Sequence, residues 1–253
     1  MPDAEVRLTN HLTDNIRDVV RREVLDPKRS AGKLFGRPRI FNDVLSSQPL
    51  CFNLFGELSL DLALASRVFA DLTRGRIATV TAIGFEHSPG RGDARYTDDR
   101  SAFDVFIEYE TARRRGFLGI EVKYNEALGE TPAEHRTRYD EIAANVGCFQ
   151  GFATARLKAS PLQQIWRDHL LAHALVQGGA YDEGSFLFLY PRDNARCANA
   201  VAMYRACLTE PSAFDAWTLE EVTDAVRLHG GGPWIAAFTD RYLAFEKIER
   251  TAK

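Results

Sequence analysis

The chain has 253 residues, of which 45% are hydrophobic and 26% are charged, a balance that excludes disordered and fibrous proteins. Its formal net charge is −3, which argues against a basic protein that coats nucleic acid non-specifically. The charge is uneven, because eight basic and three acidic residues in 17–39 leave a local charge of +5. This basic run is read equally well as a phosphate-binding face and as a solvated helix and loop.

The N-terminal residues MPDAEVRLTN contain acids and lack the apolar stretch of a signal peptide, and no apolar run approaches the ~20 residues of a membrane span. None of the four cysteines forms a C-x-x-C pair; they are Cys51, Cys148, Cys197 and Cys207. Irregularly spaced cysteines in apolar patterns indicate reduced, buried thiols. We therefore expect a cytoplasmic protein that does not enter a membrane.

The first half of the chain changes from a helical pattern to a strand pattern near residue 77. Phe52, Phe55, Leu58, Leu62 and Phe69 recur at helical spacing, and the β-branched run IATVTAIGFE follows. We expect, in order, a helix at 10–24, a loop at 26–50, a helix at 52–73, a strand at 77–86 and a loop at 87–100.

Two strands follow, FDVFIEYE at 103–110 and FLGIEVKY at 117–124, and the short polar link TARRRG makes them an antiparallel hairpin. Alternation places Glu121 and Lys123 on one face of the second strand. In the first strand, Asp104 lies on the face opposite to Phe103, Val105 and Ile107. A turn centred near 113 pairs Asp104 with a residue around 122, so a bulge or bend is needed to bring the two carboxylates together.

Helical patterns resume after the hairpin, with one more apolar strand, SFLFLY. We expect helices at 133–146 and 161–177, a strand at 185–190, and helices near 195–208, 218–228 and 234–250. The helices between the third and fourth strands form a crossover, which predicts a mixed sheet. We expect a single domain over 1–253.

The acids at 104 and 121 with the lysine at 123 resemble the motif of the PD-(D/E)XK nuclease superfamily, the restriction endonuclease-like fold. Asp104 matches the first acid, and Glu121-Val122-Lys123 matches the E-x-K element. The resemblance implies an α/β fold with an αβββαβ core, a mixed central sheet flanked by helices, over about 52–190. Residues 1–51 and 191–253 would add N- and C-terminal helices.

The resemblance also implies a metal-dependent nuclease that hydrolyses phosphodiester bonds of nucleic acid, DNA rather than RNA, with Mg²⁺ or alternatively Mn²⁺. Asp104, Glu121 and the Val122 carbonyl would bind the metal, and Lys123 would orient the attacking water. Glu57 would be an added acid from the first core helix, with Asp61 in reserve. One departure is Phe103 in place of the motif's proline, which leaves three loop acids as rivals to Asp104, namely Asp93, Asp98 and Asp99.

Nucleic-acid contacts are expected from the helix at 161–177, through Gln164 and Arg167, and from the loop before the first hairpin strand. The loop candidates are Arg91, Arg95 and Arg100. Cleavage of both strands of a duplex would suit a homodimer. The competing hypothesis is a catalytically inactive nuclease-fold module that binds nucleic acid or a partner protein.

His169 and His173 are four residues apart on an expected helix, a spacing that can bind a metal. The glutamate of an H-E-x-x-H motif is missing, and His169 falls on the apolar stripe of the helix. We therefore favour a core or interface role for this pair.

Overall fold

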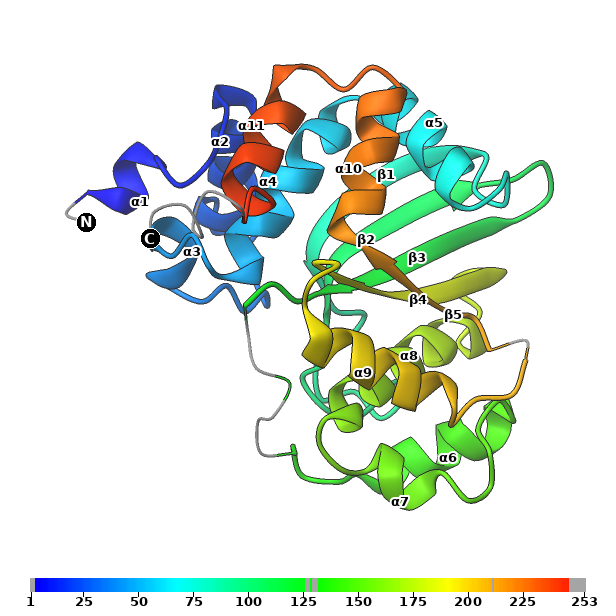
Figure 1. Ribbon diagram of the computed structural model, residues 1–253. Helices are drawn as coiled ribbons and strands as arrows, with labels where there is room; N and C mark the ends of the chain where they lie inside the picture. Colours follow the sequence, from blue (N-terminus) through cyan, green and yellow to red (C-terminus); the bar gives the residue numbers. More distant parts are fainter. Residues whose placement is uncertain (1–2, 126–127, 129–131, 211, 246–253) are drawn as a thin grey trace.

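A five-stranded mixed sheet lies between two layers of helices in the computed structural model, which describes residues 3–125, 128, 132–210 and 212–245 (Figure 1). The strand order follows the chain: β1 (Thr79–His87), β2 (Phe103–Glu110), β3 (Arg115–Val122), β4 (Glu183–Tyr190) and β5 (Phe214–Thr218). The first three strands are antiparallel, and β4 and β5 run parallel to β3. The α/β fold expected from the sequence, with a mixed central sheet flanked by helices, is confirmed.

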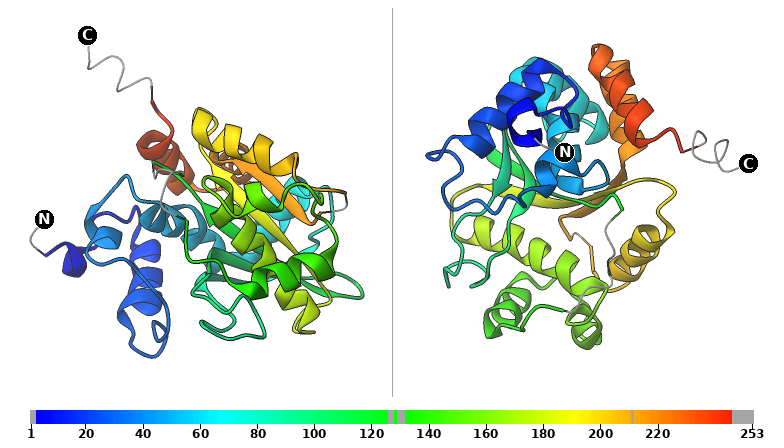
Figure 2. Two further views of the ribbon diagram at one scale, coloured as in Figure 1. Left: turned by 90° about the horizontal axis from the view of Figure 1, so that it is seen from below. Right: turned by 90° about the vertical axis from the view of Figure 1, so that its left-hand side faces the viewer.

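One face of the sheet carries the α4 layer, which is built from both ends of the chain (Figure 2). Its elements are α1 (Ala4–Arg7), α2 (Asp14–Val20), the π-helical turn η1 (Arg21–Leu25), α3 (Arg39–Asn42), α4 (Ser47–Leu60), α5 (Leu62–Leu72), α10 (Leu219–Leu228) and α11 (Pro233–Tyr242). The two ends are joined directly, since the buried Asn53 amide donates to the Tyr242 hydroxyl at 2.8 Å. The N- and C-terminal helices therefore share one core with the sheet.

The opposite face carries the α8 layer, made of the crossover helices α6 (Thr137–Val146), α7 (Thr154–Leu157), α8 (Leu162–Gln177) and α9 (Ala195–Arg205). α8 is the central helix of this layer, and its buried stripe includes Ile165, Trp166 and Leu170. No helix among the described residues is long and apolar enough to span a membrane. All four cysteines are buried and carry no disulfide bond within the part of the chain that the structure describes, as expected.

Two helical expectations were wrong in detail. The helix expected at 52–73 is two helices, because the Asp61 side chain accepts a hydrogen bond from the Leu64 amide and starts α5. α4 begins at Ser47, inside the expected loop, where the Ser46 hydroxyl caps it. The last expected helix ends at Tyr242 among the described residues, and positions 246–250 of that prediction lie outside them.

The strand β5 was not predicted. Its five residues, FDAWT, pair in parallel with β4, so α9 is a second crossover helix. Its short length and its aspartate leave no apolar run to recognise in the sequence.

The β2–β3 register differs by one residue from the predicted one. Glu110 pairs with Arg115, and Val105 with Ile120 is the last pair before Asp104. At Asp104 the contact with β3 is a side-chain hydrogen bond, from the Val122 N–H to Asp104 Oδ2, and this bond brings Asp104 beside the end of β3.

The predicted orientation of Phe103 was wrong. Its ring leaves the face of Val105 and packs in the α8 layer, 5.8 Å from the ring centroid of Phe106. The space it fills lies over Gly119, where an added Cβ would sit 2.5 Å from the Phe103 ring. Because Gly119 has no side chain, the ring of Phe103, the residue before Asp104, can lie across β3.

We predict that Gly119→Ala destabilises the protein by about 1–3 kcal/mol, because the methyl group would overlap a fully buried ring that cannot move aside. Denaturant unfolding monitored by circular dichroism measures the change. Gly151→Ala is the matched control, since nothing lies within 4 Å of its added Cβ. Equal stability of the two variants would contradict the packing argument.

Candidate functional site

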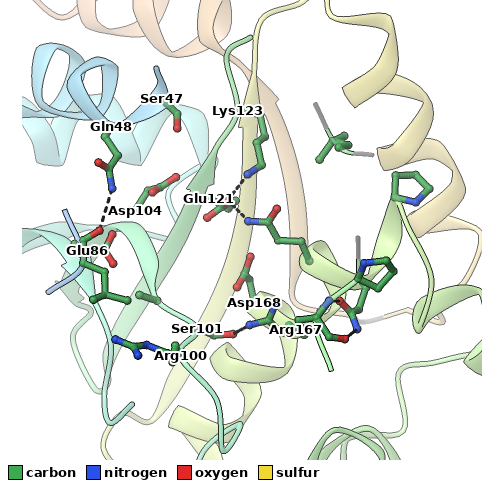
Figure 3. Close-up of a pocket in the computed structure, with 18 of the residues that line it drawn as sticks. Ser47, Gln48, Glu86, Arg100, Ser101, Asp104, Glu121, Lys123, Arg167 and Asp168 are labelled. Atoms are coloured by element: carbon green, nitrogen blue, oxygen red, sulfur yellow. Dashed lines mark hydrogen bonds and ion pairs between the residues drawn. The ribbon is translucent and has the colours of Figure 1, made fainter. Parts of the chain in front are cut away.

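A cleft of about 410 Å³ opens at the end of the sheet where β2 begins and β3 ends (Figure 3). Four carboxylates from four different elements line it: Glu86 of β1, Asp104 of β2, Glu121 of β3 and Asp168 of α8. Ser47 and Gln48, in the first turn of α4, close one side. The cleft therefore lies at one end of the strands, where both helical layers meet the sheet.

Asp104, Glu121 and Lys123 come together in this cleft, as predicted. The Asp104 Oδ2 atom accepts a hydrogen bond from the Val122 backbone N–H at 2.9 Å, which holds the start of β2 to the end of β3. The Lys123 Nζ atom lies 2.8 Å from Glu121 Oε1, and the lysine side chain is only 12% exposed. Two carboxylates and an ammonium group are thus held together in the cleft, and the side chains of Glu121 and Lys123 have little exposure to solvent.

The first turns of α8 supply three polar side chains to the same cleft. Gln164, Arg167 and Asp168 lie three and four positions apart, so they share one face of the helix. The Gln164 amide donates to Glu121 Oε1, the same oxygen that Lys123 contacts. Gln164 and Arg167 were predicted from the sequence and Asp168 was not.

Asp168 is the least satisfied acid of the cleft. It is 4% exposed, and its Oδ2 atom is buried with no hydrogen-bond partner among the described residues. An orphaned, buried carboxylate oxygen is costly, and it is usually satisfied by a cation or a donor that arrives from outside the chain.

Burial and mutual repulsion keep this acidic cluster under electrostatic strain. Burial, followed by the charge of Glu121, raises the pKa of Asp104 and that of Asp168 well above the usual range. Burial also raises the pKa of Glu86, although Arg91 opposes it. The pKa of Lys123 is raised, because Glu121 and Asp104 outweigh the effect of its own burial. The charged forms of Asp104 and Asp168 are therefore disfavoured in the cleft unless a further cation neutralises them.

The donor set fits a hard divalent cation. Mg²⁺ prefers carboxylate, carbonyl and water oxygens, and the cleft offers several carboxylate oxygens, one of them without any partner among the described atoms. Glu121 contacts the lysine, and the Val122 N–H that follows Glu121 in the chain donates to Asp104.

Glu57 does not belong to this cleft, and the expectation that it joins the site was wrong. Its carboxylate accepts hydrogen bonds from Thr13 and Asn15 in the α4 layer. α4 enters the cleft with its first turn at Ser47, and ten residues of helix at 1.5 Å each place Glu57 roughly 15 Å further along. Asp61, the reserve candidate, caps α5 instead.

The arginine candidates separate into three groups. Arg91 and Arg167 line the cleft but are committed to acids, Arg91 to Glu86 at 2.6 Å and Arg167 to Asp99 at 2.7 Å. Arg100 lines the cleft and has no ion-pair partner within the described ranges. Arg95 is not a lining residue, because its 80% exposed side chain pairs with Asp93.

The loop acids that rivalled Asp104 lie elsewhere. Asp99 is bound by Arg167, Thr97, Ser101 and Tyr139, which anchors the 88–101 loop to the α8 layer. Asp93 is held by Arg95, and neither Asp93 nor Asp98 lines the cleft. Asp104 is thus the acid of this region that lines the cleft together with Glu121.

The sequence interpretation missed Glu86 and Asp168. Asp168 could have been found, because it lies one turn after Gln164 on the same helix face. Glu86 could not, since its place beside Asp104 depends on the β1–β2 register, which shifts between Val80 and Ala82. Glu86 also has a positive φ of 51°, which breaks the regular alternation of the strand.

A family model described as the PD-(D/E)XK nuclease superfamily matches residues 1–244. No curated protein and no solved structure gives a significant match. The family match covers the sheet, the cleft and the helices at both ends of the chain. With the acids and the lysine placed on the sheet edge as the motif requires, the chain belongs to the PD-(D/E)XK nuclease superfamily.

Proposed function

We propose that this protein is a metal-dependent nuclease that hydrolyses phosphodiester bonds in DNA, with Mg²⁺ as the natural cofactor and Mn²⁺ as a substitute. The observation that carries the proposal is the cleft that Asp104 of β2 and Glu121 of β3 both line, where Lys123 contacts Glu121. Family membership supports a nuclease, and the cluster of buried carboxylates with raised pKa values supports a divalent cation.

Asp104, Glu121 and the Val122 carbonyl would hold the metal ion, which when bound supplies charge neutralisation at the phosphate and an acidified water. The backbone N–H of Val122 fixes one oxygen of Asp104. Gln164 and Lys123 both contact Glu121 Oε1, so they orient that carboxylate. Asp168 would accept a hydrogen bond from water entering the cleft through its unpartnered oxygen.

Lys123 would act as a cation and hydrogen-bond donor. Its pKa is raised by Glu121 and Asp104, so it stays protonated at neutral pH and can orient a water or stabilise negative charge that develops on the phosphate. Arg100 lines the cleft without an ion-pair partner among the described residues and can contact a phosphate, whereas Arg91 and Arg167 form ion pairs with Glu86 and Asp99. A homodimer would give two such clefts for the two strands of a duplex, and it stays a prediction.

We predict that Asp104→Ala and Lys123→Ala each lower DNA cleavage at least ~100-fold, because one removes a metal ligand and the other a positioned cation. Cleavage of plasmid and of single-stranded DNA is measured with Mg²⁺ and with Mn²⁺. Glu110→Gln is the matched control, since this exposed acid lies at the other end of β2.

Retention of full activity by both alanine variants would refute the assignment of the site. Absence of cleavage by the wild-type protein under every metal, together with DNA binding that weakens with salt, would favour the inactive binding module instead. Circular dichroism of each variant shows whether a loss of activity reflects a loss of fold.

We predict that Asp168→Asn raises the melting temperature in EDTA, because it removes a buried carboxylate whose raised pKa shows that its charge disfavours the folded state. The same change should reduce the gain in melting temperature on addition of Mg²⁺. Differential scanning fluorimetry measures both shifts. A lower melting temperature in EDTA than that of the wild type would show that Asp168 stabilises the metal-free fold.

We predict that Arg100→Ala weakens DNA binding and lowers the slope of log K against log[salt] by about one, the effect of losing one phosphate contact. Fluorescence anisotropy with a DNA duplex over a range of salt concentrations, in an Asp104→Ala background that prevents cleavage, measures the slope. Arg227→Ala is the charge-matched control on α10, where the arginine pairs with Asp224 at 2.6 Å. Equal slopes for the two variants would exclude Arg100 from the contact.

A further inference from the structure

A second group of metal-ligating atoms lies in the α8 layer, apart from the carboxylate cleft. The Cys148 Sγ atom is 3.7 Å from His173 Nε2, and His173 Nε2 is 3.0 Å from His169 Nε2. All three ligand atoms lie within 4.8 Å of one another, and none of the three residues lines the cleft. Cys148 and His169 are buried, and His173 is partly buried.

Three chain segments hold this cluster in place. His169 and His173 project from successive turns of α8. Cys148 directly follows the Gly147 that ends α6, and its carbonyl accepts a hydrogen bond from the Thr209 N–H at 2.8 Å. The three ligand residues are therefore brought together by the rigid helix and by pairing between the 148–150 and 207–209 segments.

The hydrogen bonds around His169 suit either protonation pattern of its ring. The Nδ1 atom lies 2.9 Å from the Tyr204 hydroxyl, and Nε2 lies 2.6 Å from the Ser212 carbonyl oxygen. With Nε2 protonated, the ring donates to Ser212 and accepts from Tyr204. With Nε2 bound to a metal, Nδ1–H donates to Tyr204, the type of outer contact that orients metal-bound histidines.

We propose that Cys148, His169 and His173 form a structural zinc site that is distinct from the carboxylate cleft. Ligand atoms around a tetrahedral zinc lie roughly 3.3–3.7 Å apart, given Zn–N distances of about 2.0–2.1 Å and a Zn–S distance of about 2.3 Å. The observed 3.7 Å and 3.0 Å separations lie within a few tenths of an ångström of those values. A solvent molecule or the Ser212 carbonyl completes the coordination.

The chemistry of the donors selects zinc over magnesium. Two imidazoles and a thiolate are borderline-soft ligands, whereas Mg²⁺ requires oxygen. Burial lowers the pKa of His173 to about 4 and that of His169 well below its usual range, so both rings are neutral and able to coordinate. Burial raises the pKa of the Cys148 thiol to about 11, so the metal-free thiol is protonated at neutral pH. Coordination would displace this proton, which is released to solvent.

A zinc at this position ties the 148–150 segment to α8, beside the contacts that Tyr204 and Ser212 make with His169. The same helix presents Gln164, Arg167 and Asp168 to the cleft from its first turns. The role assigned to the zinc is therefore to fix the layer that carries one wall of the cleft, and it requires no part in hydrolysis.

The test uses the full-length protein, freed of metals by chelation and titrated with Co²⁺ as a spectroscopic probe of the zinc site. We expect a near-ultraviolet thiolate-to-cobalt charge-transfer band that saturates at about one metal per chain and is displaced by Zn²⁺. The band should be present in Cys207→Ser, a second buried thiol outside the cluster, and lost in Cys148→Ser. Zn²⁺ should also raise the melting temperature of the wild type more than that of His173→Asn.

Absence of the band from the wild-type protein, or its full retention in Cys148→Ser, would overturn the proposal. The wild-type spectrum decides the first outcome even where a variant fails to fold. The band should persist in Asp104→Ala, since the cleft acids take no part, and its loss there would contradict a zinc site distinct from the cleft. None of these readouts depends on nuclease activity.

Discussion

The register between β2 and β3 is the constraint on which the candidate nuclease site depends. It brings the start of β2 beside the end of β3, where the hydrogen bond from the Val122 N–H to Asp104 Oδ2 holds Asp104. A slip of one residue would turn Glu121 to the face of Leu118 and Ile120, into the apolar core of the α4 layer. The alternation of apolar residues that buries β3 therefore also determines the direction of the Glu121 side chain.

Gathering these acids at the end of the strands destabilises the folded state, and the surrounding packing offsets this effect. Several carboxylates gather where burial and repulsion raise the pKa values of Glu86, Asp104 and Asp168, so their charged forms disfavour the folded state at neutral pH. Against this, the buried Phe103 ring lies across Gly119 and fixes the start of β2. Apolar packing thus stabilises a geometry that its own charges oppose, as is common at functional sites.

The sequence predicted those features that depend on local pattern. The hairpin and the shared face of Glu121 and Lys123 follow from period-two alternation, so they were found. Glu57 was chosen for its presence in the first core helix, but the sequence does not reveal which turn of a helix meets the sheet edge. Glu86 depends on pairing between strands with an irregular register, and β5 is too short to carry a pattern. What the sequence lacked was the relative placement of elements, which arises only from packing.

The helix α8 makes both sites parts of one mechanical unit. Its first turns bring Gln164 to Glu121 and carry the orphaned Asp168, while the next two turns carry His169 and His173. A ligand on a packed helix is positioned more precisely than one on a loop, because rotation of the helix would have to disturb every contact along it. Any interaction at the histidines that prevents α8 from rotating about its axis therefore also fixes the directions of the Gln164 and Asp168 side chains, about one turn away.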